Sequence, residues 1–259
     1  MRKKLIDFSV FSSIKIGPKV EVDIIDECNE LRDEHFLIGS CNNLVVSQNP
    51  PPLAKLSKKF DYINIKDNSL SIGAATPSGK IFSFAKKHNI SDFEFLSSLP
   101  GTLGGLVFMN AGLKEFEIFD NIISIKTCHG EILKKDIDFG YRYTKIDSTI
   151  LEATFKLSYG FDEKRVAIFK AMRANQPSTP SAGSCFKNPK GDFAGRVIEG
   201  VGLKGFRVGG ASFSDIHANF LVNHGGATYE DVLKLIDEAK KRVKATYDIE
   251  LELEIKLVN

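Results

Sequence analysis

The sequence predicts an α+β fold in two domains that meet near Gly160. Its 259 residues are enough for two compact domains. Before Gly160, short strand-like runs alternate with turn signals. After Gly160, apolar residues recur at helical spacing, and the chain closes on a strictly alternating run over residues 249–257. We therefore place a first domain at residues 1–160 and a second, C-terminal domain at residues 161–259.

The composition is that of an ordinary globular protein. Apolar residues make up 42% of the chain, charged residues 26%, and the net charge is +2 at pH 7. The one dense basic cluster, Lys240-Lys241-Arg242 with Lys244, lies on a predicted helix, where it is expected to form a solvated face. We therefore expect no nucleic acid as a partner.

The cysteines and the first residues bear on the cellular compartment. The four cysteines are Cys28, Cys41, Cys128 and Cys185. They form no Cys-x-x-Cys pair and have no histidines at zinc spacing, so we expect free thiols and no metal site. Polar residues interrupt the segment that follows the N-terminal Met-Arg-Lys-Lys, and no run approaches the roughly 20 apolar residues of a membrane span. We expect no signal peptide, no membrane association and a cytoplasmic location.

The first domain is predicted to contain mainly strands and turns. Residues 36–38 and 44–46 are strand-like on either side of the small-residue run at residues 39–43, and Asn49-Pro50-Pro51-Pro52 breaks regular structure as a linker between two lobes. Thr76-Pro77 is typical of a helix start, with Thr as N-cap and Pro as the first helical residue. Two hairpins are expected, at residues 62–72 and 122–132.

The second domain is predicted to be largely helical until its last residues. Helices are expected at residues 162–173, 193–199 and 228–246, the last of them capped by Thr228. In the closing run, the apolar residues share one face and the charged residues share the other. This periodicity does not distinguish Glu254 from Glu250 or Glu252, and a solvated polar face explains all three.

Two loops of small residues could bring backbone N–H groups close to a phosphate. The first is Gly39-Ser40-Cys41-Asn42-Asn43. The second is Leu99-Pro100-Gly101-Thr102-Leu103-Gly104-Gly105, which continues through Met109-Asn110-Ala111-Gly112. Neither contains a Walker loop or a Gly-x-Gly-x-x-Gly fingerprint. From composition alone, each loop is either an ordinary turn or a ligand-binding loop.

A third loop, Pro180-Ser181-Ala182-Gly183-Ser184-Cys185-Phe186-Lys187-Asn188-Pro189, places Ser184 between small residues. A hydroxyl held on a tight turn can donate a proton or a hydrogen bond. The loop lacks the Gly-x-Ser-x-Gly elbow, so a hydrolase nucleophile is not indicated. A serine with a purely structural role in the turn is the alternative.

In this order and spacing, the segments resemble the UDP-N-acetylenolpyruvoylglucosamine reductase family over nearly the whole chain. The resemblance is carried by the second and third loops together with Gly140-Tyr141-Arg142, Ala194-Gly-Arg-Val-Ile-Glu199, Gly202-Leu-Lys-Gly-Phe-Arg-Val-Gly-Gly210 and His217-Ala-Asn-Phe-Leu-Val-Asn223.

The resemblance implies a fold and a cofactor. It implies a two-lobed FAD-binding α/β domain of the PCMH type, with lobes at about residues 1–52 and 53–160, followed by a C-terminal α+β substrate-binding domain. It also implies non-covalent FAD, with NADPH as hydride donor. The residues that it assigns to FAD are those of the two phosphate-approach loops: Gly39, Ser40, Cys41, Asn42, Asn43, Pro100, Gly101, Thr102, Gly104 and Gly105.

The resemblance further implies a reaction and its catalytic residues. Hydride passes to the vinyl carbon of an enolpyruvyl UDP-sugar, negative charge builds on the carboxylate, and a proton reaches the adjacent carbon, in a step of cell-wall precursor synthesis. Arg142 resembles the cation that stabilises this charge, Ser184 the proton donor, and Glu254 the carboxylate partner. Lys187 and Asn188 match substrate-contacting positions.

Departures from the family pattern define a subtype and leave two alternatives. The first loop of the family usually reads Gly-Gly-Gly-Ser-Asn, and this chain lacks the inserted loop that closes over the substrate in some members. We expect the shorter subtype, as a monomer. The alternatives are another FAD-dependent oxidase of the same fold, with flavin tethered through a residue such as Cys41, and a non-catalytic nucleotide-binding protein.

Overall fold

The computed structural model describes residues 2–259, which divide into two compact units. Unit 1 comprises residues 2–3, Val22–Ser40 and Pro52–Ala174, and unit 2 comprises Lys4–Glu21, Cys41–Pro51 and Asn175–Asn259. Each unit has its own apolar core. The chain passes between the units several times, because β1 (Arg2–Asp7) and β2 (Lys19–Ile25) each begin in one unit and end in the other.

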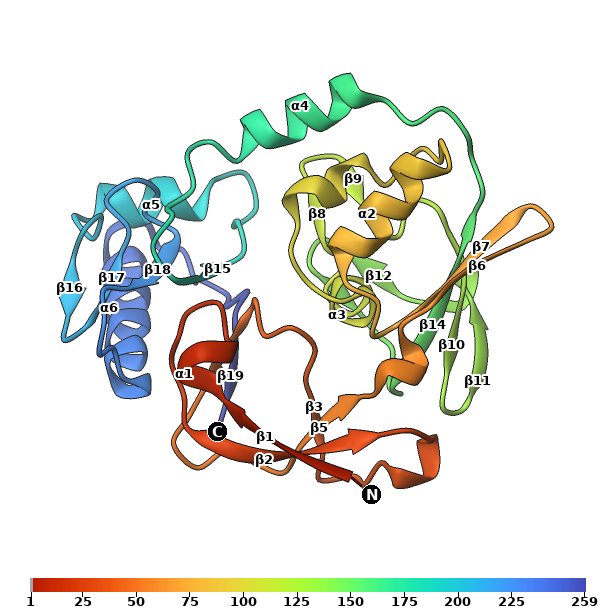
Figure 1. The fold of residues 1–259 in the computed structure, drawn as a ribbon. Helices are drawn as coiled ribbons and strands as arrows, with labels where there is room; N and C mark the ends of the chain where they lie inside the picture. The colour runs from red at the N-terminus through yellow and green to blue at the C-terminus, as the bar shows by residue number, and fades with distance from the viewer. Residues whose placement is uncertain (1) are drawn as a thin grey trace. The chain divides into compact units, whose positions relative to one another are not determined.

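The main sheet of unit 1 has five antiparallel strands in the order β11-β10-β14-β7-β6 (Figure 1). The strands are β6 (Ile63–Lys66), β7 (Ser69–Gly73), β10 (Ile122–Thr127), β11 (Gly130–Leu133) and β14 (Ile150–Lys156). Both predicted hairpins are confirmed, as β6–β7 and β10–β11. On β14, Leu151, Ala153 and Phe155 are buried and the residues between them are not, so the alternation in the sequence marks the core face.

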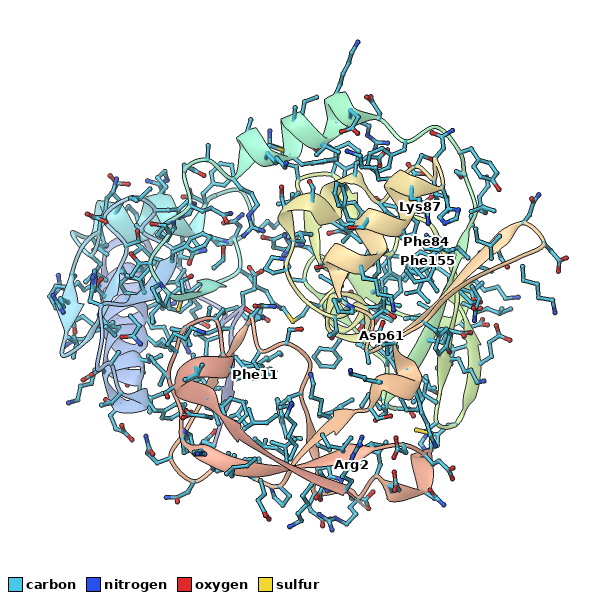
Figure 2. All side chains as sticks on the ribbon, viewed as in Figure 1. Arg2, Phe11, Asp61, Phe84, Lys87 and Phe155 are labelled. Carbon is cyan, nitrogen blue, oxygen red and sulfur yellow. A yellow bond between two sulfur atoms is a disulfide. The ribbon has the colours of Figure 1, made fainter. Side chains whose placement is uncertain are left out.

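Unit 1 also contains short helices. They are α2 (Ser78–Lys87), α3 (Leu103–Phe108) and α4 (Glu163–Met172), together with the 3-10 turns η1 (Cys28–Glu30), η2 (Lys58–Phe60), η3 (Glu94–Ser98) and η4 (Lys134–Asp136). Ile81 and Ala85 of α2 belong to the same core as Phe155, which lies beneath α2 in Figure 2. Helix α2 begins one residue later than predicted, because Pro77 is its N-cap with φ −65° and ψ 141°.

Helix α4 belongs to unit 1, whereas the sequence suggested a boundary before it, near Gly160. Phe169 packs edge-on against Phe116 with ring centroids 5.0 Å apart. The buried Glu94 carboxylate accepts from the Asp162 N–H at 3.0 Å and pairs with Arg165 at 3.7 Å. The change at Gly160 is therefore one of secondary structure, and the core of unit 1 continues to Ala174.

The segments of unit 1 before residue 60 are joined by distant pairings. β5 (Leu53–Leu56) pairs in parallel with β2 and with β3 (Phe36–Leu37), in a sheet of order β1-β2-β5-β3. A disulfide joins Cys28 to Cys128, with a Cα–Cα distance of 5.6 Å. The expectation of four free thiols is thus wrong for this pair, because sequence spacing cannot show a pairing across 100 residues.

Unit 2 combines an antiparallel sheet with three helices. The sheet has the order β15-β18-β17-β16, from β15 (Ser181–Ser184), β16 (Arg207–Val208), β17 (Ala211–Phe213) and β18 (Phe220–Asn223). The other elements are α1 (Phe8–Phe11), α5 (Ala194–Gly200), α6 (Tyr229–Tyr247), β4 (Leu44–Val46) and β19 (Lys256–Val258). The cap of α6 is as predicted, since Thr228 Oγ1 accepts from the Asp231 N–H at 3.1 Å.

The closing strand is shorter than its alternation suggested. Only Lys256–Val258 form a ladder, and they pair in parallel with Leu44–Val46 of β4. Before them, Leu253 makes an isolated antiparallel bridge with Phe186. Leu251 and Ile255 are buried as expected, so the apolar face is confirmed there. The ladder is short because the run has two successive partners.

Three further observations concern the chain between residues 2 and 259. No helix in this part combines the length and apolar character needed to cross a membrane. The same part contains no group of three or more His, Cys, Asp or Glu residues that could hold a metal ion. Cys41 and Cys185 are not part of the disulfide, and both are buried.

Candidate active site

Arg142 sits in the two-residue turn of a small hairpin in unit 1. β12 (Phe139–Gly140) pairs with β13 (Tyr143–Thr144), and Arg142 at the turn has φ +61°, a left-handed conformation that is uncommon for a residue with a side chain. The Tyr143 ring packs against Gly140, where a Cβ would lie 2.6 Å from the ring. The hairpin is fixed to α3 because Thr144 Oγ1 donates to Phe108 O at 3.0 Å. This backbone holds Arg142 at a defined place.

The guanidinium of Arg142 is held by the residues that follow α3. Its Nη2 donates to Gly112 O at 2.9 Å, and its Nη1 donates to Asn110 O at 3.4 Å. Nη1 also lies 3.8 Å from Glu117 Oε1, and the group lies 4.8 Å from the centroid of the Tyr141 ring. The side chain of Arg142 is 15% exposed, so this cation is oriented and largely shielded from water.

The second predicted loop, at residues 99–105, is packed tightly in unit 1. Gly101 has φ +153°, and its carbonyl accepts from the Ser78 N–H at 2.9 Å. The N–H of Gly104 donates to Ala74 O at 2.8 Å, and a Cβ on Gly104 would lie 3.1 Å from that of Ala74. Gly104 therefore allows close packing inside the protein, whereas Pro100 and Gly105 are exposed.

The first predicted loop is divided between the units after Ser40. Within unit 1, Gly39 lies against Thr102 of the second loop, where a Cβ on Gly39 would come within 2.6 Å of Thr102 Oγ1. Lys55 Nζ donates to Gly39 O at 2.6 Å. The structure thus brings the two predicted loops together at Gly39 and Thr102.

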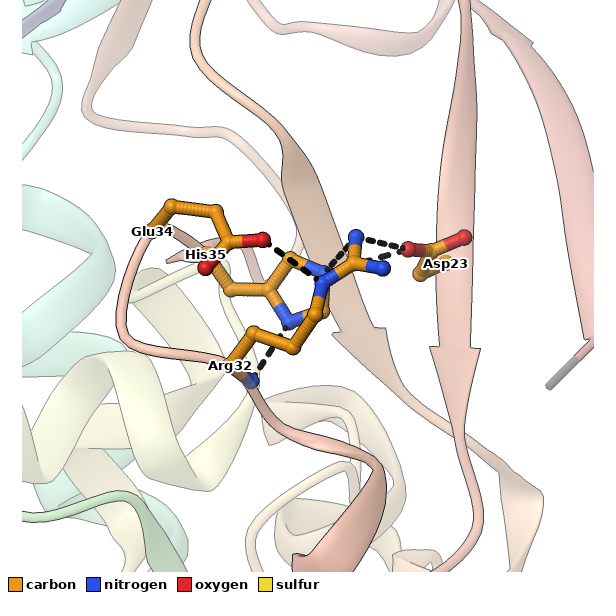
Figure 3. Close-up of polar contacts among 4 residues, drawn as sticks. All are labelled: Asp23, Arg32, Glu34 and His35. Carbon is orange, nitrogen blue, oxygen red and sulfur yellow. Dashed lines mark hydrogen bonds and ion pairs between the residues drawn. The ribbon is translucent and has the colours of Figure 1, made fainter.

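A polar cluster holds the segment that leads into β3 and Gly39 (Figure 3). The Arg32 N–H donates to His35 Nδ1 at 3.1 Å, and His35 Nε2 lies 3.1 Å from Asp23 Oδ2 and 2.7 Å from Arg32 Nη2. Arg32 Nη2 donates to the same Asp23 oxygen at 2.9 Å, and Arg32 Nε pairs with Glu34 Oε1 at 2.9 Å. The His35 side chain is 1% exposed. These contacts therefore stabilise the segment at residues 32–35, which precedes β3 and Gly39.

The remaining residues of the first loop are fixed within unit 2. Cys41 has φ +53° and is 3% exposed, and its carbonyl accepts from the Ser13 N–H at 3.2 Å. Asn42 is half-buried. Asn43 Nδ2 donates to Glu254 O at 2.9 Å, and the Lys256 N–H donates to Asn43 O at 2.9 Å. Asn43 thus positions the main chain of Glu254.

Ser184 ends β15 of unit 2, opposite Phe220 of β18. The register is irregular between Ser181 and Ser184, and Gly183 within this irregularity has φ +82°. The next residue, Cys185, donates its N–H to Asn219 O at 2.7 Å and accepts from the Glu254 N–H at 2.9 Å. Main-chain hydrogen bonds therefore bring the segments of Ser184 and Glu254 side by side.

Two residues next to Ser184 in the structure, Asn219 and Cys185, are buried, whereas Ser184 is only half-buried. Asn219 is 3% exposed; its Oδ1 accepts from the Phe186 N–H at 3.0 Å, and its Nδ2 donates to Phe186 O at 2.8 Å. Burial raises the pKa of the Cys185 thiol, so this cysteine stays protonated and is no nucleophile. Ser184 itself is half-buried, so solvent reaches part of its side chain.

The two predicted substrate-contacting residues already have partners in unit 2. Lys187 Nζ lies 2.5 Å from Glu252 Oε1, and the Lys187 N–H donates to Glu252 O at 2.9 Å. Asn188 Oδ1 accepts from the Ala194 N–H at 3.0 Å, which caps the first turn of α5. These contacts fix the positions of Lys187 and Asn188, which follow Ser184 in the sequence.

Sequence reasoning did not identify the residues that hold the predicted catalytic groups. Asn110, Glu117 and Asn219 have this role, and all are polar residues in or beside the motifs that carried the resemblance. Two of them gave a signal, because Asn110 and Asn219 lie within motifs that carried the resemblance. Glu117 gave none, since a hairpin with strands of two residues brings it next to Arg142.

Comparison with known proteins agrees with the fold and with the resemblance. Residues 175–258 match the family model described as the UDP-N-acetylenolpyruvoylglucosamine reductase C-terminal domain. The chain is 47% identical to the UDP-N-acetylenolpyruvoylglucosamine reductase of Campylobacter jejuni strain RM1221, over 98% of this chain and 100% of that protein. It is 47% identical to the reductase of the same name from Helicobacter hepaticus, over 100% of both chains.

A solved structure extends this similarity to three dimensions. The crystal structure of the UDP-N-acetylenolpyruvylglucosamine reductase from Thermus caldophilus matches with a TM-score of 0.88 at 30% identity, over 100% of both chains. The similarity therefore covers both units from end to end. The chain belongs to the UDP-N-acetylenolpyruvoylglucosamine reductase family of oxidoreductases.

Proposed function

We propose that this protein reduces the enolpyruvyl group of UDP-N-acetylglucosamine enolpyruvate, with FAD as bound cofactor and NADPH as hydride donor. The product would be UDP-N-acetylmuramate, a precursor of peptidoglycan. The observation that carries the proposal is the end-to-end similarity to proteins that bear the name of this reductase, at up to 47% identity. We place the reaction in the cytoplasm, where its nucleotide substrates are made, and expect a monomer.

The two small-residue loops fit a dinucleotide that binds without a covalent link. Gly105 is exposed, and a Cβ built on it would meet only Thr102 Oγ1 among residues 2–259, at 3.7 Å. Small residues of this kind let a ligand approach the backbone. Residues Gly39–Asn43 and 100–105 would hold FAD, which supplies hydride transfer when bound. The burial of Cys41 disfavours a thiol tether.

Arg142 would bind the carboxylate of the enolpyruvyl group. The guanidinium is permanently charged, so it can stabilise the negative charge that develops on this carboxylate as the vinyl carbon gains hydride. Its orientation by Gly112 O and Asn110 O is set before the substrate binds. Preorganisation of this kind lowers the reorganisation that the transition state requires.

Ser184 would donate the proton that completes the reduction. Its Oγ–H would pass the proton to the carbon next to the carboxylate, and solvent would then reprotonate Oγ. Glu254 would act as the carboxylate partner, since the Cys185–Glu254 backbone hydrogen bond keeps its segment beside Ser184. Lys187 and Asn188, which follow Ser184 on the same stretch, would contact the sugar nucleotide.

An anaerobic stopped-flow experiment tests the proposal. The purified flavoprotein is mixed with NADPH, and the loss of flavin absorbance near ~450 nm reports the first half-reaction. UDP-N-acetylglucosamine enolpyruvate is then added without oxygen. We expect the absorbance to return at a rate that depends on the sugar concentration. Absorbance that stays bleached after the sugar is added would refute the proposed substrate.

A further inference from the structure

We propose that Glu117 is a positioning residue for Arg142, with Asn110 as the group that fixes Glu117. The inference rests on the proposed function, because it concerns the cation assigned to the substrate carboxylate. It adds a residue that the sequence comparison did not single out. Three features of unit 1 support it.

The first feature is a hairpin that places Glu117 beside the guanidinium of Arg142. β8 (Gly112–Leu113) pairs with β9 (Phe116–Glu117), and the register sets Gly112 opposite Glu117. A Cβ on Gly112 would lie 2.2 Å from Phe116 O and 3.0 Å from Glu117 Cγ, so only glycine permits this approach. The carbonyl of the same Gly112 accepts from Arg142 Nη2 at 2.9 Å. One tight hairpin thus presents a carbonyl and a carboxylate to Arg142.

The second feature is a hydrogen bond from Asn110 that fixes the Glu117 carboxylate. Asn110 Nδ2 donates to Glu117 Oε2 at 2.6 Å, which leaves Oε1 on the side of Arg142 at 3.8 Å from Nη1. Asn110 is fully buried with φ +42°, and its Nδ2 also donates to Gly140 O at 3.0 Å. A single buried amide therefore ties the Glu117 side chain to the hairpin that carries Arg142. Neither partner can rotate without breaking a hydrogen bond.

The third feature is the burial of the two opposite charges. The side chains of Arg142 and Glu117 are 15% and 22% exposed, so both charges are largely removed from water. In such surroundings a charge requires a nearby opposite charge or several hydrogen bonds. Glu117 meets this requirement at Nη1, and it restricts the orientations that the guanidinium can adopt. A fixed orientation matters because misplacement of a catalytic group by about 1 Å can slow a reaction roughly a hundredfold.

The inference predicts different effects on the two half-reactions. A neutral amide at residue 117 retains the size of the side chain but removes the charge that holds Arg142. In Glu117→Gln we expect the sugar half-reaction to slow roughly tenfold to a hundredfold. Reduction of the flavin by NADPH should keep its rate, because that step forms no carboxylate charge for Arg142 to stabilise. FAD content and the melting temperature should stay close to those of the unaltered protein.

Two variants show whether Glu117 acts through Arg142. Glu117→Asp retains the charge and should recover part of the rate that Glu117→Gln loses. Arg142→Lys should slow the sugar half-reaction by itself, and adding Glu117→Gln to it should cause little further loss, because a lysine offers no guanidinium to orient. Glu115→Gln is the matched control, since Glu115 is an exposed carboxylate in the turn of the same hairpin.

The outcomes separate this inference from the function on which it rests. If Arg142→Lys slows the sugar half-reaction but Glu117→Gln does not, the inference is wrong and the proposed function stands. The inference also fails if Glu117→Gln slows both half-reactions equally with loss of FAD, or if its effect adds in full to that of Arg142→Lys. An Arg142→Lys variant as fast as the unaltered protein would overturn both the proposed role of Arg142 and the inference.

Discussion

The two units place their predicted catalytic residues by different means. In unit 1, the end of the long Arg142 side chain is held by the carbonyls of Gly112 and Asn110 and by the Glu117 carboxylate. In unit 2, Ser184 and Glu254 are held by the main chain, through Cys185 and its hydrogen bonds to Asn219 and Glu254. Arg142 should therefore be sensitive to substitution of its polar neighbours, whereas Ser184 and Glu254 should be sensitive to changes that disturb the backbone.

The difference follows from the type of group that each unit presents. A long arginine side chain has many rotamers, so several contacts are needed to fix its end. A serine hydroxyl is one bond from Cβ, so a fixed backbone is almost enough to place it. The irregular register between Ser181 and Ser184 provides that backbone in unit 2.

The largest effect is expected for the proton donor itself. Ser184→Ala leaves the backbone of β15 unchanged and removes only the hydroxyl. We expect the sugar half-reaction to slow by about 10²–10⁴-fold, the usual contribution of a general acid, while reduction by NADPH is unaffected. Ser83→Ala, on the exposed side of α2, should change either rate little. Equal rates for Ser184→Ala and the unaltered protein in both half-reactions would exclude Ser184 as the acid.

The next largest effect is expected on the stability of unit 1, which contains the only disulfide in residues 2–259. The Cys28–Cys128 bond closes a segment of 100 residues, and opening it should lower the free energy of unfolding by about 3 to 4 kcal/mol. Urea unfolding with and without dithiothreitol measures the loss. Cys28→Ser/Cys128→Ser, insensitive to dithiothreitol, is the control.

A thiol count decides whether the bond forms. The denatured, unreduced protein should show two reactive thiols, those of Cys41 and Cys185, and the reduced protein should show four. Four thiols without reductant in protein purified under air would contradict the pairing.

A comparable effect is expected in unit 2 from the amide that supports the main chain at Ser184. Asn219→Ala leaves the N–H and C=O of Phe186 without the partners that they have now. Each unsatisfied buried group costs about 1 to 3 kcal/mol, so we expect the free energy of unfolding to fall by about 2 to 4 kcal/mol. Asn64→Ala, on the exposed surface of β6, is the control in the same urea titration. A loss no greater than that of the control would mean that Asn219 does not support this turn.

The smallest change in the free energy of unfolding is expected for Gly79, which contacts neither Arg142 nor the segments of Ser184 and Glu254. Gly79 lies in the first turn of α2, and a Cβ there would have no atom within 4 Å. Gly79→Ala should raise the free energy of unfolding by about 0.5 to 1 kcal/mol, because alanine favours the helix. Gly112→Ala should lower it, since the new Cβ overlaps Phe116 O. A stabilising effect of Gly112→Ala in thermal unfolding would contradict the tight hairpin next to Arg142.

Local patterns in the sequence predicted much of the fold. The helix from Thr228, the helix after Asp162 and the hairpins at residues 62–72 and 122–132 are all confirmed, because caps and periodicity act over a few residues. The disposition of the N-terminal segments was not predictable in this way. β4 pairs with β19 across more than 200 residues, and no local signal specifies such a partner.

The candidate site was predictable from resemblance and not from periodicity. The alternation at residues 249–257 gave no reason to choose Glu254, which differs from Glu252 in its contacts: the main chain of Glu254 bonds to Cys185 and Asn43. Glu117 escaped prediction because the hairpin that joins it to Arg142 has strands of two residues, too short to leave a pattern.

The most direct test of the account is the identity of the product. The purified protein is incubated with NADPH and UDP-N-acetylglucosamine enolpyruvate in deuterated water, and the sugar nucleotide is analysed by mass spectrometry and NMR. We predict that NADPH is consumed in step with conversion of the vinyl group to a lactyl group that carries solvent deuterium next to the carboxylate. An unchanged vinyl group, with NADPH oxidised at the same rate whether or not the sugar is present, would contradict the account.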